Sequence, residues 1–403
     1  MSVEMPEGWE DVSLDDCLYD LRNGWTYDTR ATNGTLPITR IETVSNGQID
    51  YARVGYTTTD DRIEAFRLQE NDILFSHINS VEHIAKVAIK SDARLLYHGM
   101  NLMRLRPNER VAPAFLLARL QSDKTRAHYR AACKRAINQA SLNKGEVSGY
   151  RFPLPPLDEQ RRIAEVLGSV DEAIATAQSA LKASQAIHQI LLERLFGLFI
   201  INASTNGSVG MTIEACCKRV TYGFTNPMPT ATDGPWLLTA LNIRHGWIDY
   251  ENARHTSSEA YANLITEKSR PPIGSILVTK DGTLGRVAIV DRHDVCVNQS
   301  VAVLSPDCDV IHPPFLSYLL QSGSGQAKML SESGGSSVKH IYISKLAKME
   351  IGVPTLEVQR ENAVLAEESE KAIQAQTAPL RRLMQVRTII ASDLLSGRVR
   401  VPA

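Results

Sequence analysis

The sequence predicts an α+β (mixed α/β) protein in which two globular domains alternate with two long helices. Three observations predict this fold class: a repeat at half the chain length, a strand-rich first part in each copy, and a helical last part with a seven-residue periodicity. The chain has 403 residues, of which 43% are hydrophobic, and this is enough for two packed cores.

The repeat consists of short segments that recur in the same order, most of them at an offset of 199 or 200 residues. PAFLLARLQS at 113–122 matches PPFLSYLLQS at 313–322, and PPLDEQRR at 155–162 matches PTLEVQRE at 354–361. A period this long excludes a solenoid and indicates a duplicated domain-plus-helix unit. We therefore expect globular domains at 1–155 and 204–354, and long helices at 156–203 and 355–403.

Within each globular part, short apolar runs alternate with Gly, Asn, Asp and Pro, which is typical of strands and loops. DILFSHI at 72–78 and GSILVT at 274–279 predict strands. The segments at 115–121 and 315–321 predict short helices that begin near a proline. We interpret the glycine-rich SGSGQ at 322–326 as a loop.

In the two helical parts, apolar residues recur in steps of four and three, which predicts a coiled-coil seam in helices of about 40 residues. The expected seam residues are Ile163, Leu167, Val170, Ile174, Leu181, Leu191 and Leu195 in the first helix, and Ile373, Leu380, Leu383, Ile390 and Leu394 in the second. Ser184 and His188 interrupt the first series, and Pro379 is expected to kink the second helix. An amphipathic helix packed on its own domain would show a similar stripe. Two matching copies favour pairing between the helices.

The sequence lacks the motifs of several kinds of catalytic site. The chain has no Walker A loop, no GxGxxG after a strand, no HExxH, no GxSxG and no CxxC. HPPF at 312–315 resembles the Asn-Pro-Pro-aromatic motif of amino-methyltransferases, but His replaces the Asn, so we interpret it as a helix start. We predict no catalytic residues and no metal site. Because the chain lacks a signal-peptide layout and a long apolar run, we expect a cytoplasmic protein without a membrane segment.

Charge is distributed unevenly, although the net charge is only −1. Eleven Lys or Arg residues lie between Arg104 and Arg151, against three acids, and such clustering suits phosphate contacts as well as a solvated surface. Side chains with the chemistry for bases or phosphates give our candidate DNA contacts. These are Arg135, Asn138, Gln139, Asn143 and Lys144 in the first copy, and Lys280, Asp281, Thr283, Arg286, Gln299, Ser336, Ser337 and Lys339 in the second.

Taken together, these segments resemble the specificity subunit of type I restriction-modification enzymes over essentially the whole chain. PLPPLDEQRRIAEVL and LLERLFG are similar to the central conserved region of that family. VPTLEVQRENAVL and ASDLLSGRVRV are similar to its distal conserved region. PEGWEDVSLDDC, TYGFTNPM and GSILVTKDGTLGRVAIV resemble parts of its target-recognition domains.

The resemblance implies a sequence-specific, non-catalytic DNA-binding subunit. Two target-recognition domains would each read one half of a bipartite site in double-stranded DNA. Two long antiparallel helices would separate them, set the unread spacer and dock two methyltransferase (modification) subunits, which restriction/translocase subunits would join. The partners would carry the adenine-N6 methyltransferase and ATP-dependent endonuclease activities and would use S-adenosylmethionine, ATP and Mg, so no cofactor is expected in this chain.

The second copy departs from the family pattern at three places. Val358 replaces the Glu of the Leu-x-Glu-Gln motif, Glu361 replaces a basic residue, and Pro379 interrupts the helix. The second helix is therefore expected to bend or to pair less regularly. Two other functions remain open at this point. A coiled-coil scaffold for proteins would show no salt-dependent DNA affinity, and a divergent stand-alone DNA methyltransferase or nuclease would need a cofactor or metal site.

Overall fold

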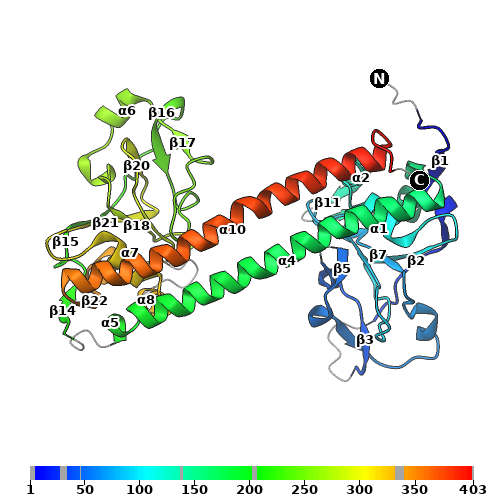
Figure 1. Ribbon diagram of the computed structural model, residues 1–403, viewed down its shortest axis with the longest axis horizontal. Coiled ribbons are helices and arrows are strands. Elements are labelled where there is room, and N and C mark those ends of the chain that lie inside the picture. Colours follow the sequence, from blue (N-terminus) through cyan, green and yellow to red (C-terminus); the bar gives the residue numbers. More distant parts are fainter. Residues whose placement is uncertain are drawn as a thin grey trace. The chain divides into compact units, whose positions relative to one another are not determined.

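The computed structural model describes residues 5–27, 34–45, 47–136, 139–201, 207–331 and 340–401. The chain divides into two compact parts: unit 1, made of residues 1–177 and 380–403, and unit 2, made of residues 178–379. Each unit combines a mixed domain of strands and short helices with part of both long helices (Figure 1). The predicted α+β class is therefore confirmed.

Unit 1 is built on a six-stranded sheet whose strands are antiparallel except for one parallel pair, β5 and β9. The strand order is β2 (Leu18–Asn23), β10 (Met103–Pro107), β7 (Ile73–Phe75), β9 (Val87–Ile89), β5 (Gly47–Ile49) and β4 (Val44–Ser45). Smaller sheets pair β1 (Glu10–Ser13) with β13 (Arg151–Leu154), β3 (Leu36–Ile38) with β6 (Gly55–Thr57), and β12 (Gln139–Ser141) with both β11 (Lys134–Ala136) and β8 (Ile78–Asn79). Its short helices are α1 (Pro113–Gln121), α2 (Asp123–Ala132) and α3 (Lys144–Ser148).

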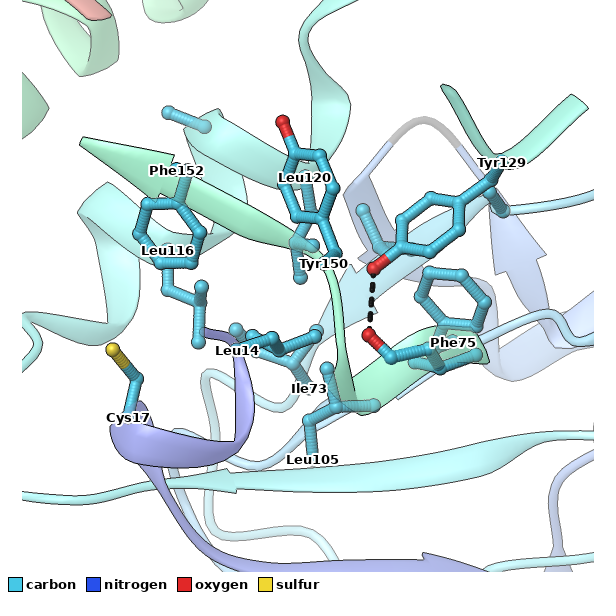
Figure 2. Close-up of a cluster of buried hydrophobic side chains, with 14 of the residues drawn as sticks. Leu14, Cys17, Ile73, Phe75, Leu105, Leu116, Leu120, Tyr129, Tyr150 and Phe152 are labelled. Atoms are coloured by element: carbon cyan, nitrogen blue, oxygen red, sulfur yellow. Dashed lines mark hydrogen bonds between the residues drawn. The ribbon is translucent and has the colours of Figure 1, made fainter. Parts of the chain in front are cut away.

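The core of unit 1 lies between this sheet and the short helices. Phe75, from the predicted strand, meets Tyr129 of α2 with ring centroids 5.0 Å apart. The Tyr129 hydroxyl donates a hydrogen bond to the Val147 carbonyl oxygen, 3.0 Å away (Figure 2). Phe152 and Leu116 belong to the same buried cluster, and each buried side chain of this kind contributes about 1.5–3 kcal/mol.

Unit 2 repeats this plan with its own sheets. Its main sheet has the order β15 (Cys217–Tyr222), β21 (Val301–Pro306), β18 (Ile276–Thr279) and β19 (Val287–Ile289). A second sheet places β16 (Ala231–Leu238) between β17 (Arg254–His255) and β20 (Val295–Val297), and β14 (Val209–Thr212) pairs with β22 (Glu350–Val353). Its short helices are α5 (Leu198–Ile201), α6 (Ser258–Asn263), α7 (Pro313–Gln321), α8 (Gly323–Ser331) and α9 (Ile343–Lys348).

The two units have the same strand order, and each contains an equivalent close backbone contact. The order β2-β10-β7-β9 of unit 1 corresponds to β15-β21-β18-β19 of unit 2. Gly24 and Gly223 occupy the same place after β2 and β15. An added Cβ would lie 1.8 Å from the Gly99 carbonyl oxygen at Gly24 and 1.9 Å from the Val297 carbonyl oxygen at Gly223. Both positions therefore require glycine, which confirms the duplication in three dimensions.

One local prediction is wrong, because the glycine-rich segment after α7 forms α8 and not a loop. The Ser322 hydroxyl accepts a hydrogen bond from the Gly325 amide at the start of α8. An added Cβ on Gly325 would lie 2.1 Å from the Leu319 carbonyl oxygen of α7. Gly325 thus allows the close approach of two consecutive helices, and packing outweighs its low helix propensity.

The long helices are α4 (Leu157–Phe196) and α10 (Leu356–Ser396), drawn in green and in orange to red in Figure 1. In unit 1, Arg387 of α10 forms an ion pair with Asp171 of α4 at 2.9 Å. In unit 2, the His188 ring lies 3.1 Å from the Ser369 hydroxyl, and the Asn362 amide donates to the Leu195 carbonyl oxygen. Within unit 2, residues further along α4 contact residues earlier in α10, so the two helices pair antiparallel there.

Every predicted seam residue is buried or half-buried. The two polar interruptions also lie in the seam, where they meet polar partners. The Gln376 amide donates to the Ser184 hydroxyl at 2.9 Å, and His188 contacts Ser369. Pro379 lies inside α10 without ending it. Among the described helices, none has the length and apolarity needed to cross a bilayer.

Candidate functional site

Both long helices begin with a buried glutamine that fastens the helix to its domain. In α4, Gln160 accepts a hydrogen bond from the Ala112 amide at 2.8 Å and donates to the carbonyl oxygens of Arg110 and Pro155. Its exposed fraction is 1%. These contacts tie the start of α4 to the chain between β10 and α1.

Gln359 repeats every one of these contacts at the start of α10. It accepts from the His312 amide at 2.7 Å and donates to the carbonyl oxygens of Val310 and Pro354. His312 is the N-cap residue of α7 and Pro313 follows it, so the interpretation of HPPF as a helix start is confirmed. The glutamine of the repeated motif therefore has a structural role in both units.

The glutamine attachments lie at the end of each main sheet where β10 and β21 finish. The other end of each main sheet has no such attachment and carries polar loops. In unit 1 we call it the Gly24 end, where β2 and β7 finish and β10 and β9 begin. In unit 2 we call it the Gly223 end, where β15 and β18 finish and β21 and β19 begin. Trp25 in unit 1 and Phe224 in unit 2 follow the two glycines and make equivalent single bridges, to Gly99 and Asn298.

The Gly223 end brings several predicted contact residues together. The Lys280 amide donates to the Ser300 carbonyl oxygen at 2.9 Å, and the Gln299 amide donates to the Phe224 carbonyl oxygen at 2.7 Å. The backbone at three strand ends thus meets here, and Gln299 is exposed. Thr283 is exposed in the loop between β18 and β19.

An aromatic ring that sequence reasoning missed lies in the same place. Tyr222, at the end of β15, has the ammonium groups of Lys268 and Lys280 at 5.3 and 5.7 Å from its ring centroid. Cations at this distance are attracted by the ring face. Two ammonium groups beside an exposed ring form a local positive surface that suits phosphate contacts. Tyr222 lies in the TYGFTNPM segment but was not among the predicted contacts, and neither was Lys268, because the sheet brings the two together from distant segments.

Asp281 and Arg286 are engaged within the protein. Asp281 accepts from Lys280 Nζ at 2.7 Å and lies 2.5 Å from His340 Nδ1. Burial alone would raise the pKa of Asp281, but the bonds from Lys280 and His340 outweigh it and hold this pKa below its ordinary value. The Arg286 guanidinium donates to the Ile243 carbonyl oxygen at 3.3 Å. Asp281 therefore positions Lys280 instead of offering a free acceptor to a cytosine amine.

The basic segment of unit 1 is largely used inside the fold. Arg104 and Arg119 are each 3% exposed, and Arg119 donates to the carbonyl oxygens of Pro153 and Leu395. Arg106 is paired with Asp72. These arginines are unavailable for phosphates, so the charge count of the segment overstates its free positive surface.

The remaining candidates of unit 1 differ in their availability. Arg135 is exposed in β11, and Gln139 is exposed at the start of β12. Asn143 caps α3, because its side chain accepts from the Glu146 amide at 2.8 Å, whereas Lys144 is exposed in the first turn. Four candidates lie outside the described residues: Asn138, Ser336, Ser337 and Lys339. Within the described ranges, no group of three His, Cys, Asp or Glu side chains is placed to hold a metal ion.

Comparisons with known proteins agree with this architecture. Residues 6–184 and 233–376 match the family model described as the type I restriction modification DNA specificity domain. The chain is 29% identical to the putative type I restriction enzyme MjaX specificity subunit of Methanocaldococcus jannaschii, over 99% of this chain and 95% of that protein. It is 26% identical to the EcoBI specificity subunit of Escherichia coli, over 56% of this chain and 52% of that one.

A solved structure shares the fold. The crystal structure of the type I restriction-modification S subunit from M. genitalium matches with a TM-score of 0.55 at 14% sequence identity, covering 98% of this chain and 97% of that one. At this identity the match concerns the fold alone. The family model spans most of the chain and both copies of its repeat. The chain therefore belongs to the type I restriction-modification DNA specificity family.

Proposed function

We propose that unit 1 and unit 2 of this specificity subunit each read one half of a bipartite site in double-stranded DNA. The observation that carries the proposal is the duplicated fold, in which the same sheet end has different side chains in each copy. Two modules with one backbone plan and different polar groups suit two half-sites of different sequence. Family membership disfavours both a scaffold without DNA specificity and a stand-alone enzyme.

The Gly24 and Gly223 ends are the proposed reading surfaces. Each contains an aromatic residue beside cationic side chains: Tyr222 with Lys268 and Lys280 in unit 2, and Trp25 with Arg62, whose guanidinium lies 5.4 Å from the ring centroid, in unit 1. Phosphate contacts would position the duplex and polar side chains would read base edges. The opposite sheet ends are occupied by the glutamine attachments of the helices.

The long helices are the proposed spacer element and docking site. Their antiparallel pairing and polar seam contacts fix a register, which a ruler for the unread base pairs requires. We propose that two methyltransferase subunits bind this chain and that restriction/translocase subunits join them. The duplication supports two copies of one partner. On this proposal S-adenosylmethionine, ATP and Mg are used by the partners, and the chain acts by positioning DNA.

The test is to map methylated adenines in cells that express the partner methyltransferase subunit with or without this chain. We expect a motif of two short blocks separated by a fixed number of unread pairs, present only when this chain is expressed. Co-purification of the two proteins is the control for assembly. An assembled complex without any split motif would contradict the proposal.

A further inference from the structure

A cavity of about 330 Å³ lies at the Gly24 end of unit 1. Its lining includes Arg40, Glu42 and Asn101. Asn101 lies two residues before β10 and has a φ of 67°, a left-handed conformation that Asn tolerates better than most residues. The cavity therefore opens beside strand ends that we assign to DNA reading.

Arg40 has an incomplete set of hydrogen bonds in this cavity. Its Nε is buried and has no hydrogen-bond partner. The guanidinium lies over Gly55, where an added Cβ would come within 2.6 Å of Arg40 Nε and 3.2 Å of the Tyr27 hydroxyl. Gly55 thus provides the space for the guanidinium. The Arg40 side chain is thus held between Gly55 and the Tyr27 hydroxyl, and Arg40 lines the cavity.

Glu42 supplies the opposite hydrogen-bonding character two residues further along the chain. It belongs to the short 3-10 turn Ile41–Thr43, and its side chain is exposed. A guanidinium offers a planar pair of donors, and a carboxylate offers only acceptors. In the major groove, guanine presents the acceptors O6 and N7, and its paired cytosine presents the N4 amine donor. The Arg40 and Glu42 pair therefore matches both halves of a G·C pair.

Unit 2 lacks this arrangement at the corresponding place. ITR at 38–40 corresponds to LTA at 238–240, so Ala240 stands where unit 1 has Arg40. The turn that follows is equivalent in the two units, because the amides of Asp50 and Asp249 donate to the carbonyl oxygens of Thr43 and Asn242. The Ala240 amide donates to the Ser300 hydroxyl at 3.0 Å. Unit 2 offers no guanidinium here.

We propose that the Arg40 cavity reads one G·C pair of the unit 1 half-site, with Arg40 on the guanine and Glu42 on the cytosine. This inference rests on the proposed function, because it assigns a base pair to a surface that must contact DNA. It also makes the half-sites unequal, since unit 2 has alanine at the corresponding position.

The experiment compares Arg40→Ala, Arg40→Lys and the control Arg151→Ala in the complex with the methyltransferase subunit. Arg151 pairs with Asp11 on β1, away from the Gly24 end, so its loss removes the same charge. Methylated sites give the motif of each variant. Competition binding with duplexes that differ at one position then gives the discrimination against the wrong pair.

We expect Arg40→Ala to make one G·C position of one half-site degenerate and to reduce discrimination there by roughly 5- to 150-fold. Arg40→Lys should lose the same discrimination, because an ammonium group cannot make the two-pronged contact. The other half-site is the internal control for folding and assembly, and Arg151→Ala should keep the complete wild-type motif.

Three results would overturn the inference. The first is an Arg40→Ala motif identical to the wild type. The second is a wild-type motif with Arg40→Lys, since this would assign Arg40 to a phosphate contact. If the Arg40→Ala complex yields no methylated sites, the motif of the Arg40→Lys complex alone decides. The third is a wild-type chain without a split motif, which would contradict the proposed function itself. A split wild-type motif that both variants leave unchanged would refute only the role of the Arg40 cavity.

Discussion

The first turns of α4 and α10 share a glutamine but differ at the residue before it. Glu159 of α4 is 5% exposed, accepts from Trp9 Nε1 at 3.1 Å and is paired with Arg400 at 2.7 Å. Val358 of α10 is 37% exposed. In unit 1 the chain segments before β1 and after α10 are separate and meet at Glu159. In unit 2 the corresponding segments, after α4 and before β14, are continuous in sequence.

This comparison changes the interpretation of the departure at Val358. From the sequence, the loss of the glutamate suggested a less regular second helix. The structure shows that the glutamate serves partners that belong only to unit 1, whereas the attachment common to both units is the glutamine. A substitution within a repeat is thus informative only when the partners of each copy are known.

The largest expected effect is the loss of either glutamine attachment. Gln160→Leu and Gln359→Leu each leave a buried backbone amide and two carbonyl oxygens without partners, at about 1–3 kcal/mol for each unsatisfied group. We expect each variant to lower the free energy of unfolding by about 3 kcal/mol or more. Urea unfolding measures this, with Gln385→Leu on the exposed side of α10 as the control. Losses no larger than that of the control would contradict the attachment.

A smaller effect distinguishes the two helix starts directly. Glu159→Gln removes a charge bonded to Trp9 and Arg400, and we expect it to cost about 2 kcal/mol at neutral pH. Val358→Glu adds a carboxylate at a partly exposed position and should change the stability by less than about 0.5 kcal/mol. Equal losses in the two variants would show that both starts need the same residue.

One buried glutamate in each unit should contribute to stability with an opposite pH dependence. Burial would raise the pKa of Glu159, but bonds from Arg400 and Trp9 outweigh it and lower this pKa, so its stabilisation is present above the unfolded value and is lost as pH falls through the folded one. Burial raises the pKa of Glu370, against the bond from Tyr318, so its ionised form weakens the fold above the unfolded pKa.

Unfolding of Glu159→Gln and Glu370→Gln across acid and neutral pH tests this difference. Glu159→Gln should be less stable than the wild type at pH 7 and approach it in acid. Glu370→Gln should be more stable than the wild type at pH 7, because a neutral amide avoids the buried charge, and this gain should vanish in acid. Parallel pH curves for the two variants would refute the contrast.

A further expected effect concerns the polar seam contact of unit 2. Replacing Ser184 and Gln376 together by leucine exchanges a hydrogen-bonded pair for an apolar contact. We expect the free energy of unfolding to rise by about 1 kcal/mol, because polar seam residues specify register at a cost in stability. Thermal and urea unfolding measure the change, with leucine at the exposed Gln374 as the control. A marked loss of stability in the double variant would show that the pair stabilises the seam.

The fold was largely predictable where the signal is local. Heptad spacing and a repeat offset are read along the chain, so the seam and the duplication could be found without contacts. The SGSGQ segment was misread because packing of α8 on α7 decides its structure. Tyr222 and Lys268 in unit 2 and Arg40 in unit 1 were not among the residues predicted from the sequence, because the contacts of each depend on segments that are distant along the chain. Asp281 has the chemistry of a base reader, but its partners Lys280 and His340 are visible only in three dimensions.

The most direct test of the account lengthens both helices and measures the DNA motif. Seven residues that continue the seam would be inserted after Ala177 in α4 and after Pro379 in α10, where the two units divide in sequence. One heptad adds roughly 10 Å of helix, or roughly 3 base pairs. We predict a methylation motif with both half-sites unchanged and a spacer longer by about that amount. An assembled, active complex that keeps the wild-type spacer would contradict the claim that the paired helices set the distance between two DNA-reading units.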